Sequence, residues 1–299
     1  MFSLLADPLT VLGPRRADAT TTRSDALVAL GKVIDPRAKK HPQLRSTALT
    51  VAVSSGGRSA WAFDVVHFEG RAIAVTAILS NTSDLWSVTT AALALVPSAA
   101  RAKTESARDA VVPPGAAAAG KVDPAAARVV DDWKKGLLDP DSWGTELMSQ
   151  SDAIYAGPTT GQVAHGKQAI RQLWKARARA NVREAVSGEI TAAVTADGQL
   201  AWLSAPVTRV ADGEDPLPLR SFAVYEKDGA AWKLIVLHEG LAIDQPGSGT
   251  AHKKIVPAAP APPKTEPARP DDKKPGDTAT AKVKPAKKRK KPARKSDDP

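Results

Sequence analysis

The sequence contains no cysteine, which excludes one group of structures and chemistries at once. Without cysteine there is no disulfide bond, no thiol nucleophile and no thiolate metal site. Histidine is scarce as well, and His41, His67, His165, His238 and His252 lack the spacing of a metal site. No phosphate-binding glycine loop is present. We therefore expect neither a metal ion nor another cofactor.

Long apolar runs are also missing. No uncharged apolar stretch reaches the ~20 residues that a membrane-spanning helix needs. At the start of the chain the basic pair Arg15-Arg16 follows the apolar residues, whereas a secretory signal has the opposite order. These features, with the lack of disulfides, predict a cytoplasmic protein. The Ala-, Arg- and Pro-rich composition is typical of bacterial proteins from GC-rich genomes.

Excess positive charge is absent from most of the chain and is concentrated at its end. Ala251–Pro299 holds 15 of the 42 basic residues and 6 of the 32 acidic ones, which leaves 27 basic and 26 acidic side chains before it. From about Pro246 there are almost no large apolar side chains to bury, so residues 246–299 are predicted to form a disordered tail. The tail could bind DNA or another anionic surface by charge alone, or serve only to solubilise the protein. The candidate anion-binding residues are Lys287, Lys288, Arg289, Lys290, Lys291, Arg294 and Lys295.

What the chain does contain is a repeat. Leu49–Val66 reads LTVAVSSGGRSAWAFDVV and Ile190–Val207 reads ITAAVTADGQLAWLSAPV, with Trp61 and Trp202 at matching places. A second pair of apolar segments follows each of them. A repeat of this length indicates a duplicated domain. We predict a first domain at residues 1–98, an Ala- and Pro-rich linker at 99–121 and a second domain at 122–245.

The second domain is predicted to begin with helices and to end with an antiparallel meander, which makes it α+β. Asp123-Pro124 is a typical helix start, and apolar residues then recur at helical spacing. The expected helices are Pro124–Leu138, Ser142–Ser149 and Gly166–Ala180, and the expected strands are Arg183–Thr195, Leu200–Arg209, Arg220–Lys227 and Trp232–Ile243.

Two parts of this domain resemble a known family. The helix start HGKQAIRQLW and the ending with Tyr225, Asp228-Gly229, Trp232 and His238 are similar to the SnoaL-like branch of the nuclear transport factor 2-like superfamily. The resemblance implies two cones, each a curved antiparallel sheet wrapped on helices, with a cavity at the wide end. The superfamily includes isomerases, dehydratases, cyclases and non-catalytic scaffolds, so it constrains function weakly.

The first domain has the strands of the second but no counterpart of the helix Pro124–Leu138. One face of its sheet is therefore expected to be uncovered, and the natural start could lie upstream. We expect this domain to be a degenerate, structural copy.

Three residues are candidates for catalysis in the second domain. Strand alternation is expected to place His238 on the face of Leu234 and Val236, at the mouth of the cone, where it could act as a general acid or base. Asp152 and Tyr155 lie in a region that faces the cavity in the family. Each residue also has a structural interpretation: a buried histidine with a hydrogen bond, a solvated aspartate and a packed tyrosine.

Four further residues could line a ligand site: Trp174, Trp202, Arg220 and Phe222. Large aromatic residues at these spacings usually fill a core, and an arginine at a strand start usually points to water.

Our leading interpretation is a non-catalytic tandem cone protein with a pocket for a small apolar or amphipathic molecule in the second domain. The cones are expected to pair within the chain or to dimerise. One alternative is an isomerase, dehydratase or cyclase that acts through His238 with Asp152 or Tyr155. Another is a scaffold that the basic tail tethers to DNA.

Overall fold

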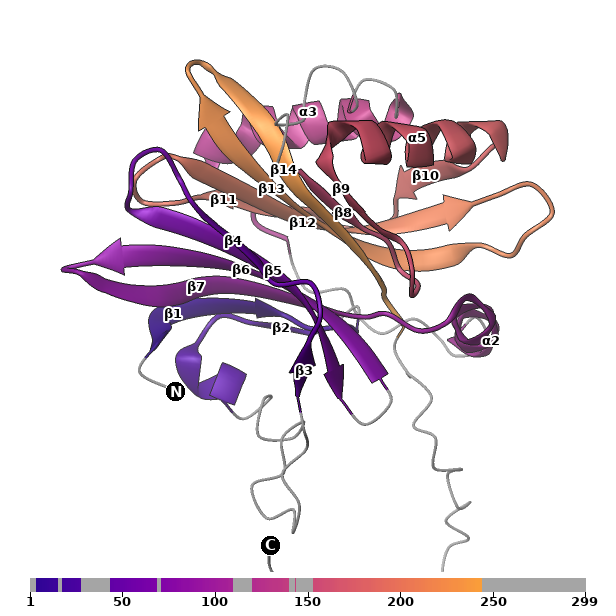
Figure 1. The fold of residues 1–299 in the computed structure, drawn as a ribbon, viewed down its shortest axis with the longest axis horizontal. Coiled ribbons are helices and arrows are strands. Elements are labelled where there is room, and N and C mark those ends of the chain that lie inside the picture. Colours follow the sequence, from indigo (N-terminus) through magenta and orange to yellow (C-terminus); the bar gives the residue numbers. More distant parts are fainter. Residues whose placement is uncertain are drawn as a thin grey trace, which may run out of the picture. The chain divides into compact units, whose positions relative to one another are not determined.

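The structure, a computed structural model, describes residues 4–15, 18–27, 44–68, 71–109, 120–139, 143 and 153–243. It is an α+β fold in which few helices accompany a large, mainly antiparallel sheet (Figure 1). The predicted tail and, apart from Trp143, the predicted helix 142–149 lie outside the described residues. None of the helices within these ranges combines the length and the apolar character needed to cross a bilayer.

The strands fall into two sets along the chain. The first set is β1 (Leu5–Leu12), β2 (Ala19–Thr20), β3 (Arg45–Ser46), β4 (Thr50–Val53), β5 (Ser59–Phe68), β6 (Arg71–Thr82) and β7 (Leu85–Leu95). The second set is β8 (Ile154–Ala156), β9 (Val163–His165), β10 (Arg183–Val186), β11 (Thr191–Val194), β12 (Leu200–Val210), β13 (Leu217–Asp228) and β14 (Ala231–Leu241).

The two sets are paired in the same way, as the sequence repeat predicts. Strands β5, β6 and β7 form an antiparallel meander, and so do β12, β13 and β14. Trp61 pairs with Ala52 in the first set, and Trp202 pairs with Ala193 in the second. A short parallel strand flanks each meander: β1 pairs with β7, and β8 pairs with β14. A single register pair between β7 and β14 joins the two sets into one sheet of 14 strands.

The turns of the second meander follow the chemistry of the sequence. Gly198 and Gly229 have φ of 68° and 58°, a backbone region that glycine enters without steric cost. They lie in the predicted Asp197-Gly198 and Asp228-Gly229 turns, which join β11 to β12 and β13 to β14. The first predicted strand of this set is divided, because β10 and β11 are separated by residues 187–190.

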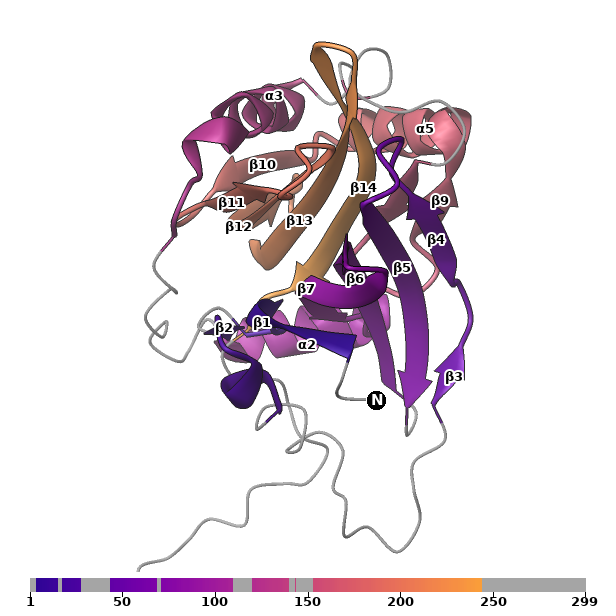
Figure 2. The same cartoon turned by 90° about the vertical axis from the view of Figure 1, so that its left-hand side faces the viewer.

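The helices of the second set begin where the sequence predicts. The Asp123 side chain accepts a hydrogen bond from the Ala125 amide, and Pro124 opens the short 3₁₀ helix η2 (Pro124–Ala126). The chain continues into α3 (Ala127–Leu138), and α5 (Gly166–Arg179) follows β9. Both helices lie on the same face of the second strand set (Figure 2).

The segment predicted to be a linker contains a helix. Residues Ala99–Asp109 form α2, in which Ala102, Glu105 and Ser106 are buried. Alanine-rich sequence favours helix once one face can be buried, and here Ala102 belongs to the hydrophobic core of the second strand set. The composition of residues 99–121 was therefore a poor guide to this part of the chain.

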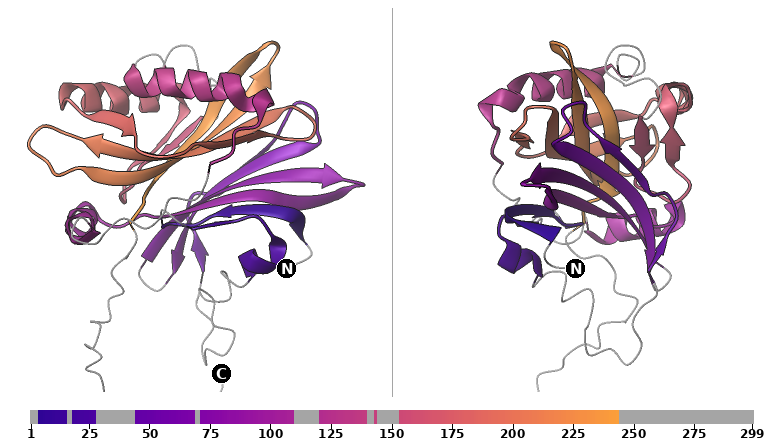
Figure 3. Two further views of the ribbon diagram at one scale, coloured as in Figure 1. Left: turned by 180° about the vertical axis from the view of Figure 1, so that it is seen from behind. Right: turned by 60° about the vertical axis from the view of Figure 1, so that its left-hand side comes forward.

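Two hydrophobic cores lie on opposite faces of the second strand set. The helix-side core contains Trp133, Trp143 and Trp174 between the helices and the sheet. The second, which we call the inter-sheet core, lies between the two strand sets and contains Trp61, Trp202 and other apolar side chains. The views in Figure 3 show the resulting order of layers: helices, second strand set, first strand set. The far face of the first set is less covered, since alternate residues of β6 are buried and half-buried.

Candidate functional site

The last strand, β14, contains a β-bulge that decides which side chains face the helix-side core. Val224 pairs with Val236 and Tyr225 with Leu234, so Ile235 is an extra residue without a partner on β13. An extra residue reverses the alternation of all side chains that follow it. Leu234 and Leu237 accordingly point to the helix-side core, whereas Ile235 and Val236 both belong to the inter-sheet core.

The bulge sends His238 to the face opposite the one predicted. Its Nδ1 lies 3.1 Å from the Thr76 hydroxyl of β6, and its ring meets Phe63 edge-on at 6.2 Å between centroids. The side chain is fully buried against the first strand set. Burial lowers the pKa of His238 to about 4, against the smaller opposing effect of Glu239, so the imidazole is neutral at physiological pH.

Glu239, the next residue, takes the place that sequence alternation assigned to His238. Its Oε2 accepts a hydrogen bond from the Tyr155 hydroxyl at 2.5 Å and one from Arg177 at 2.9 Å. Arg209 also binds Glu239, and its Nη2 lies 2.5 Å from Glu184. Arg177 contacts the Tyr155 hydroxyl and lies 3.6 Å from Glu184. These five residues form what we call the buried charge cluster.

Two arginines and two glutamates balance one another in this cluster. Burial by itself raises the pKa of Glu239, but Arg209 and Arg177 outweigh it and lower the pKa to about 2. Burial also raises the pKa of Tyr155 well above its ordinary value, so the phenol keeps its proton. Tyr155 therefore acts as a hydrogen-bond donor to a carboxylate that is charged at neutral pH.

The buried charge cluster has no counterpart in the first strand set. The matching registers place Val11 where the second set has Tyr155, and Leu93 where it has Glu239. Leu44 precedes β3 at the place of Glu184. Buried polar side chains of the second repeat are thus replaced by apolar ones in the first. Tyr155 is one of the predicted polar residues, whereas Glu239 and Glu184 were not predicted.

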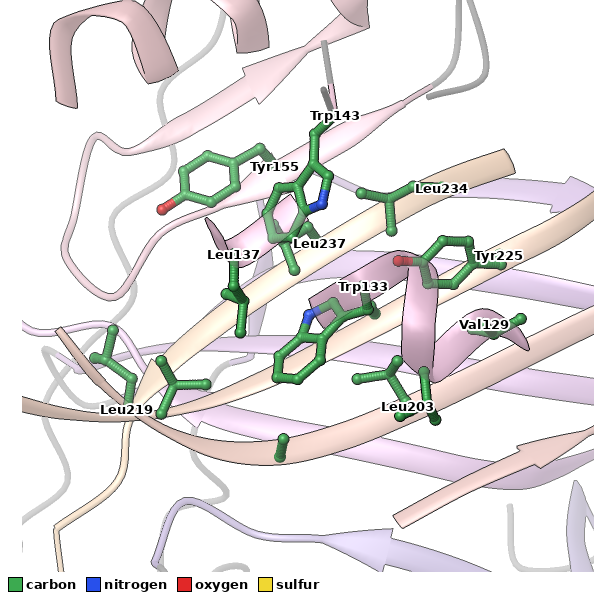
Figure 4. Packing of buried hydrophobic residues seen from close by; sticks show 14 of the residues in the cluster. Val129, Trp133, Leu137, Trp143, Tyr155, Leu203, Leu219, Tyr225, Leu234 and Leu237 are labelled. Carbon is green, nitrogen blue, oxygen red and sulfur yellow. The ribbon is translucent and has the colours of Figure 1, made fainter. Parts of the chain in front are cut away.

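Tryptophan side chains fill the space between the helices and the second strand set. Figure 4 shows the Trp133 indole in the middle of this packing, with Leu137, Leu203 and Leu237 around it. The Trp143 ring lies against Gly136, where a Cβ atom added to the glycine would fall 0.7 Å from the indole nitrogen. Trp174, a candidate ligand contact, is 2% exposed and belongs to this same packing. It therefore fills the core and does not line an open cavity among the described residues.

The structure does not bring the four candidate ligand residues together. Trp202 and Phe222 stack on each other at 5.8 Å in the inter-sheet core, on the opposite face from Trp174. Arg220 donates hydrogen bonds to the backbone oxygens of Gly13 and Asp18 and so holds the β1–β2 turn. The four residues lie at three separate places. Trp174 belongs to helix α5 on one face of the sheet, whereas Arg220, Phe222 and Trp202 point to the other face, where Arg220 lies beyond the stacked pair and contacts the β1–β2 turn.

The three candidate catalytic residues are not united either. Tyr155 faces the helix-side core and His238 the inter-sheet core, on opposite sides of the sheet. Asp152 lies outside the described residues, as do the seven candidate anion-binding residues of the tail. A constellation of His238 with Tyr155 is therefore excluded by the geometry.

A cavity of about 460 Å³ opens beside the buried charge cluster. Arg177 and Arg209 form part of its floor, and one face of α2 forms a wall with Ala102, Lys103 and Ser106. The remaining lining is mixed, with apolar groups such as Pro158, Val182 and Leu217 and the polar side chains of Thr159, Gln162, Glu214 and Asp215.

Two polar atoms in the lining of this cavity have no hydrogen-bond partner among the described residues. They are Ser106 Oγ and Gln162 Oε1. The Gln162 oxygen lies 2.5 Å, and the Tyr155 hydroxyl 2.8 Å, from the point that a Cβ atom on Gly157 would occupy. Buried polar groups are normally paired, so these two unpaired atoms are exceptions that belong to residues of the cavity lining.

The sequence alone missed Glu239, Arg177, Arg209 and Glu184. One signal was available: a glutamate inside the otherwise apolar ending LIVLHEGLAI is unusual unless a partner is present. Within the described ranges, no three His, Cys, Asp or Glu side chains come together as a metal site would require.

Solved structures similar to this chain include nuclear transport factor 2-like proteins. One from Salmonella enterica is 15% identical, covers 42% of this chain and 93% of its own, and has a TM-score of 0.34. One from Pseudomonas putida, of unknown function, is 16% identical over 38% of this chain and 81% of its own, with a TM-score of 0.32.

A third similar structure is a nuclear transport factor 2-like protein of unknown function from Shewanella oneidensis. It is 11% identical, covers 39% of this chain and 96% of its own, and has a TM-score of 0.32. No protein-family model and no curated protein matches the sequence. At these values the likeness says nothing about activity.

Proposed function

We propose that the second repeat is a non-catalytic binding module that takes a small amphipathic molecule into the cavity beside α2. Its polar end would meet the Arg177 and Arg209 guanidinium groups, Gln162 and Ser106. Its apolar part would lie against Pro158, Val182 and Leu217 at the other side of the lining.

One observation carries this proposal. The cavity of about 460 Å³ has a mixed lining in which Ser106 Oγ and Gln162 Oε1 lack partners among the described residues. Small-molecule sites typically combine apolar walls with a few converging polar groups. Because the two arginines can only donate and Gln162 Oε1 can only accept, the favoured polar group is one that both accepts and donates, such as an amide or an alcohol.

The same groups favour binding over acid–base catalysis. A general acid or base works best with a pKa near the operating pH. The pKa of Glu239 is lowered to about 2, and that of Tyr155 is raised well above its ordinary value. Neither group therefore exchanges its proton near neutral pH.

The experiment is a thermal-shift screen of the full chain with benzyl alcohol, benzamide and longer aliphatic alcohols and amides. A molecule that binds the native state raises the melting temperature. Gly157→Ala should weaken the shift, because its Cβ atom would displace the Tyr155 and Gln162 side chains, and Gln162 lines the cavity. Gly56→Ala is the matched control, since its Cβ atom would meet only side chains of the hairpin region around Gln199. If no compound raises the melting temperature, or if Gly157→Ala leaves the shift unchanged, the proposal is wrong.

The composition of the tail supports a second role, in which it tethers the protein to DNA or to another anionic surface. The run Lys282–Lys295 contains no acidic and no aromatic residue, so any binding would depend on charge alone. Retention on DNA should then fall steeply with salt and disappear on truncation at Pro246. Retention that resists salt, or that survives truncation, would contradict this role.

A further inference from the structure

Among the described residues the outer edge of β4 is unpaired, whereas the equivalent edge of the second repeat is paired. In the second repeat, Val122 forms a parallel bridge with Ala192 of β11. Asp123 donates its amide to the Ala192 oxygen, and Ala192 donates its own amide to Lys121, both at 2.9 Å. In the described part of the first repeat, β4 pairs with β5 and with no other strand.

Val51 is the residue of β4 that corresponds to Ala192. The Val51–Ala62 pair is the neighbour of the Ala52–Trp61 pair in the first repeat. The Ala192–Leu203 pair is the neighbour of the Ala193–Trp202 pair, on the same side, in the second repeat. The hairpin gives a second indication of direction. The Ser54 amide donates to Ser59 on β5, so the backbone groups of Val53 and Val51, one and three residues earlier, point away from β5.

The side chains on this edge are apolar and exposed. Leu49, Val51 and Val53 are 64%, 57% and 55% exposed. Ala48 and Ala52, which alternate with them along the strand, pack on the inter-sheet core. From Ser46 to Gly57 the sequence contains no charged residue and no proline. Natural edge strands are normally protected by lysine, proline or a covering segment. The edge of β4 carries neither lysine nor proline, as is typical of a strand that pairs with another strand.

We propose that the edge of β4 pairs with the same edge of a second copy of this chain, antiparallel and about a two-fold axis at Val51. This pairing is separate from the ligand cavity and does not depend on it. Val51 would face Val51 of the partner subunit in a hydrogen-bonded pair. Leu49 would face Val53 of the partner subunit, and Val53 would face Leu49 of the partner subunit.

The edge is suited to its own copy for two reasons. First, the register places each of the three outward-facing apolar residues opposite an apolar residue of the partner subunit. Because identical edges pair about a two-fold axis, the assembly stops at a dimer. The flanking charges also agree with it, because Arg45 and Arg58 would lie opposite the uncharged Gly57 and Leu44 of the partner subunit. No pair of like charges is brought together.

Cysteine cross-linking tests the register directly, because the natural chain has no cysteine to interfere. Hydrogen-bonded antiparallel partners have Cα atoms ~5.5 Å apart, within the range that a disulfide spans. Full-length Val51→Cys should therefore form a disulfide-linked dimer under mild oxidation. Val53→Cys alone should not, since its counterpart lies four residues away along the strand. The double variant Leu49→Cys with Val53→Cys should cross-link again.

The oligomeric state gives a second, independent measurement. The full chain should sediment as a dimer, and Val51→Lys should weaken association by about tenfold or more, since a charge at an edge opposes pairing. Val210→Lys is the matched control, because Val210 is also exposed, at 43%, but lies in the second repeat. It should leave the dimer intact. A chain that is monomeric at all concentrations, a dimer unaffected by Val51→Lys, or a stronger cross-link at Val53 than at Val51 would each overturn the proposal.

Discussion

Acid should weaken the fold through His238, which lies between the two strand sets. Burial lowers the pKa of His238 from 6.5 to about 4. The unfolded chain therefore takes up a proton as the pH falls through about 6.5, whereas the folded protein resists it down to about 4. The stabilisation is fully present above the unfolded-state pKa and is lost progressively as the pH falls towards the folded-state pKa.

The magnitude follows from the size of this shift. The full difference is equivalent to about 3 kcal/mol, and about 2 kcal/mol of it should be lost between about pH 7 and about pH 5. The titration of Glu239 contributes little between about pH 7 and about pH 5. Its pKa is lowered from 4.5 to about 2, so its own contribution is lost only at lower pH.

The assay is urea unfolding at pH 7, 6 and 5, followed by the fluorescence of the seven tryptophans. The double variant Thr76→Val with His238→Leu replaces the hydrogen-bonded pair by apolar groups and leaves no orphaned hydroxyl. It should lose much less stability over this range than the natural chain. His67→Gln is the control, since His67 is exposed, and it should lose as much stability over this pH range as the natural chain. Equal losses in the double variant and the natural chain would show that His238 is not the group responsible.

Two further substitutions test the buried charge cluster and the tryptophan packing. Glu239→Gln leaves two buried arginines without their shared carboxylate and should destabilise the fold by about 3 kcal/mol, measured by urea unfolding at neutral pH. Asp228→Asn, in an exposed turn, should change stability little. If it destabilised the fold as much as Glu239→Gln, the loss could not be assigned to the buried charge cluster. Gly136→Ala places a Cβ atom on the Trp143 indole and should cost about 2 kcal/mol and shift the tryptophan emission. Lys134→Ala, on the exposed side of the same helix, should do neither.

Local features of the chain were predictable because they depend on neighbouring residues. The Asp123-Pro124 helix start, the Asp-Gly turns and the matching tryptophans Trp61 and Trp202 all predicted elements that the structure contains. Each of these signals acts over a few residues, through capping, backbone freedom or strand alternation. The repeated strand pairing follows from the repeated sequence for the same reason.

The candidate site was less predictable because one residue reversed a whole strand. The prediction that Leu234, Val236 and His238 share one face assumed a regular strand. Nothing in the amino-acid sequence marks Ile235 as the extra residue of a bulge. The first repeat has the same bulge, since Ile78 pairs with Thr90 and Leu79 with Val88. Its presence at the equivalent place in both repeats, three residues after Trp86 and Trp232, shows that the bulge belongs to the repeated fold.

The sequence by itself determined the α+β class, the matching strand segments around Trp61 and Trp202, the starts of two helices and the Asp-Gly turns. Those properties depend on local chemistry and on the comparison of one half of the chain with the other. Only the tertiary structure decided that Glu239 and not His238 meets Tyr155, and that α2 forms a wall of the cavity. Both depend on which face of the sheet a residue occupies, and that is settled by pairing between strands distant in sequence.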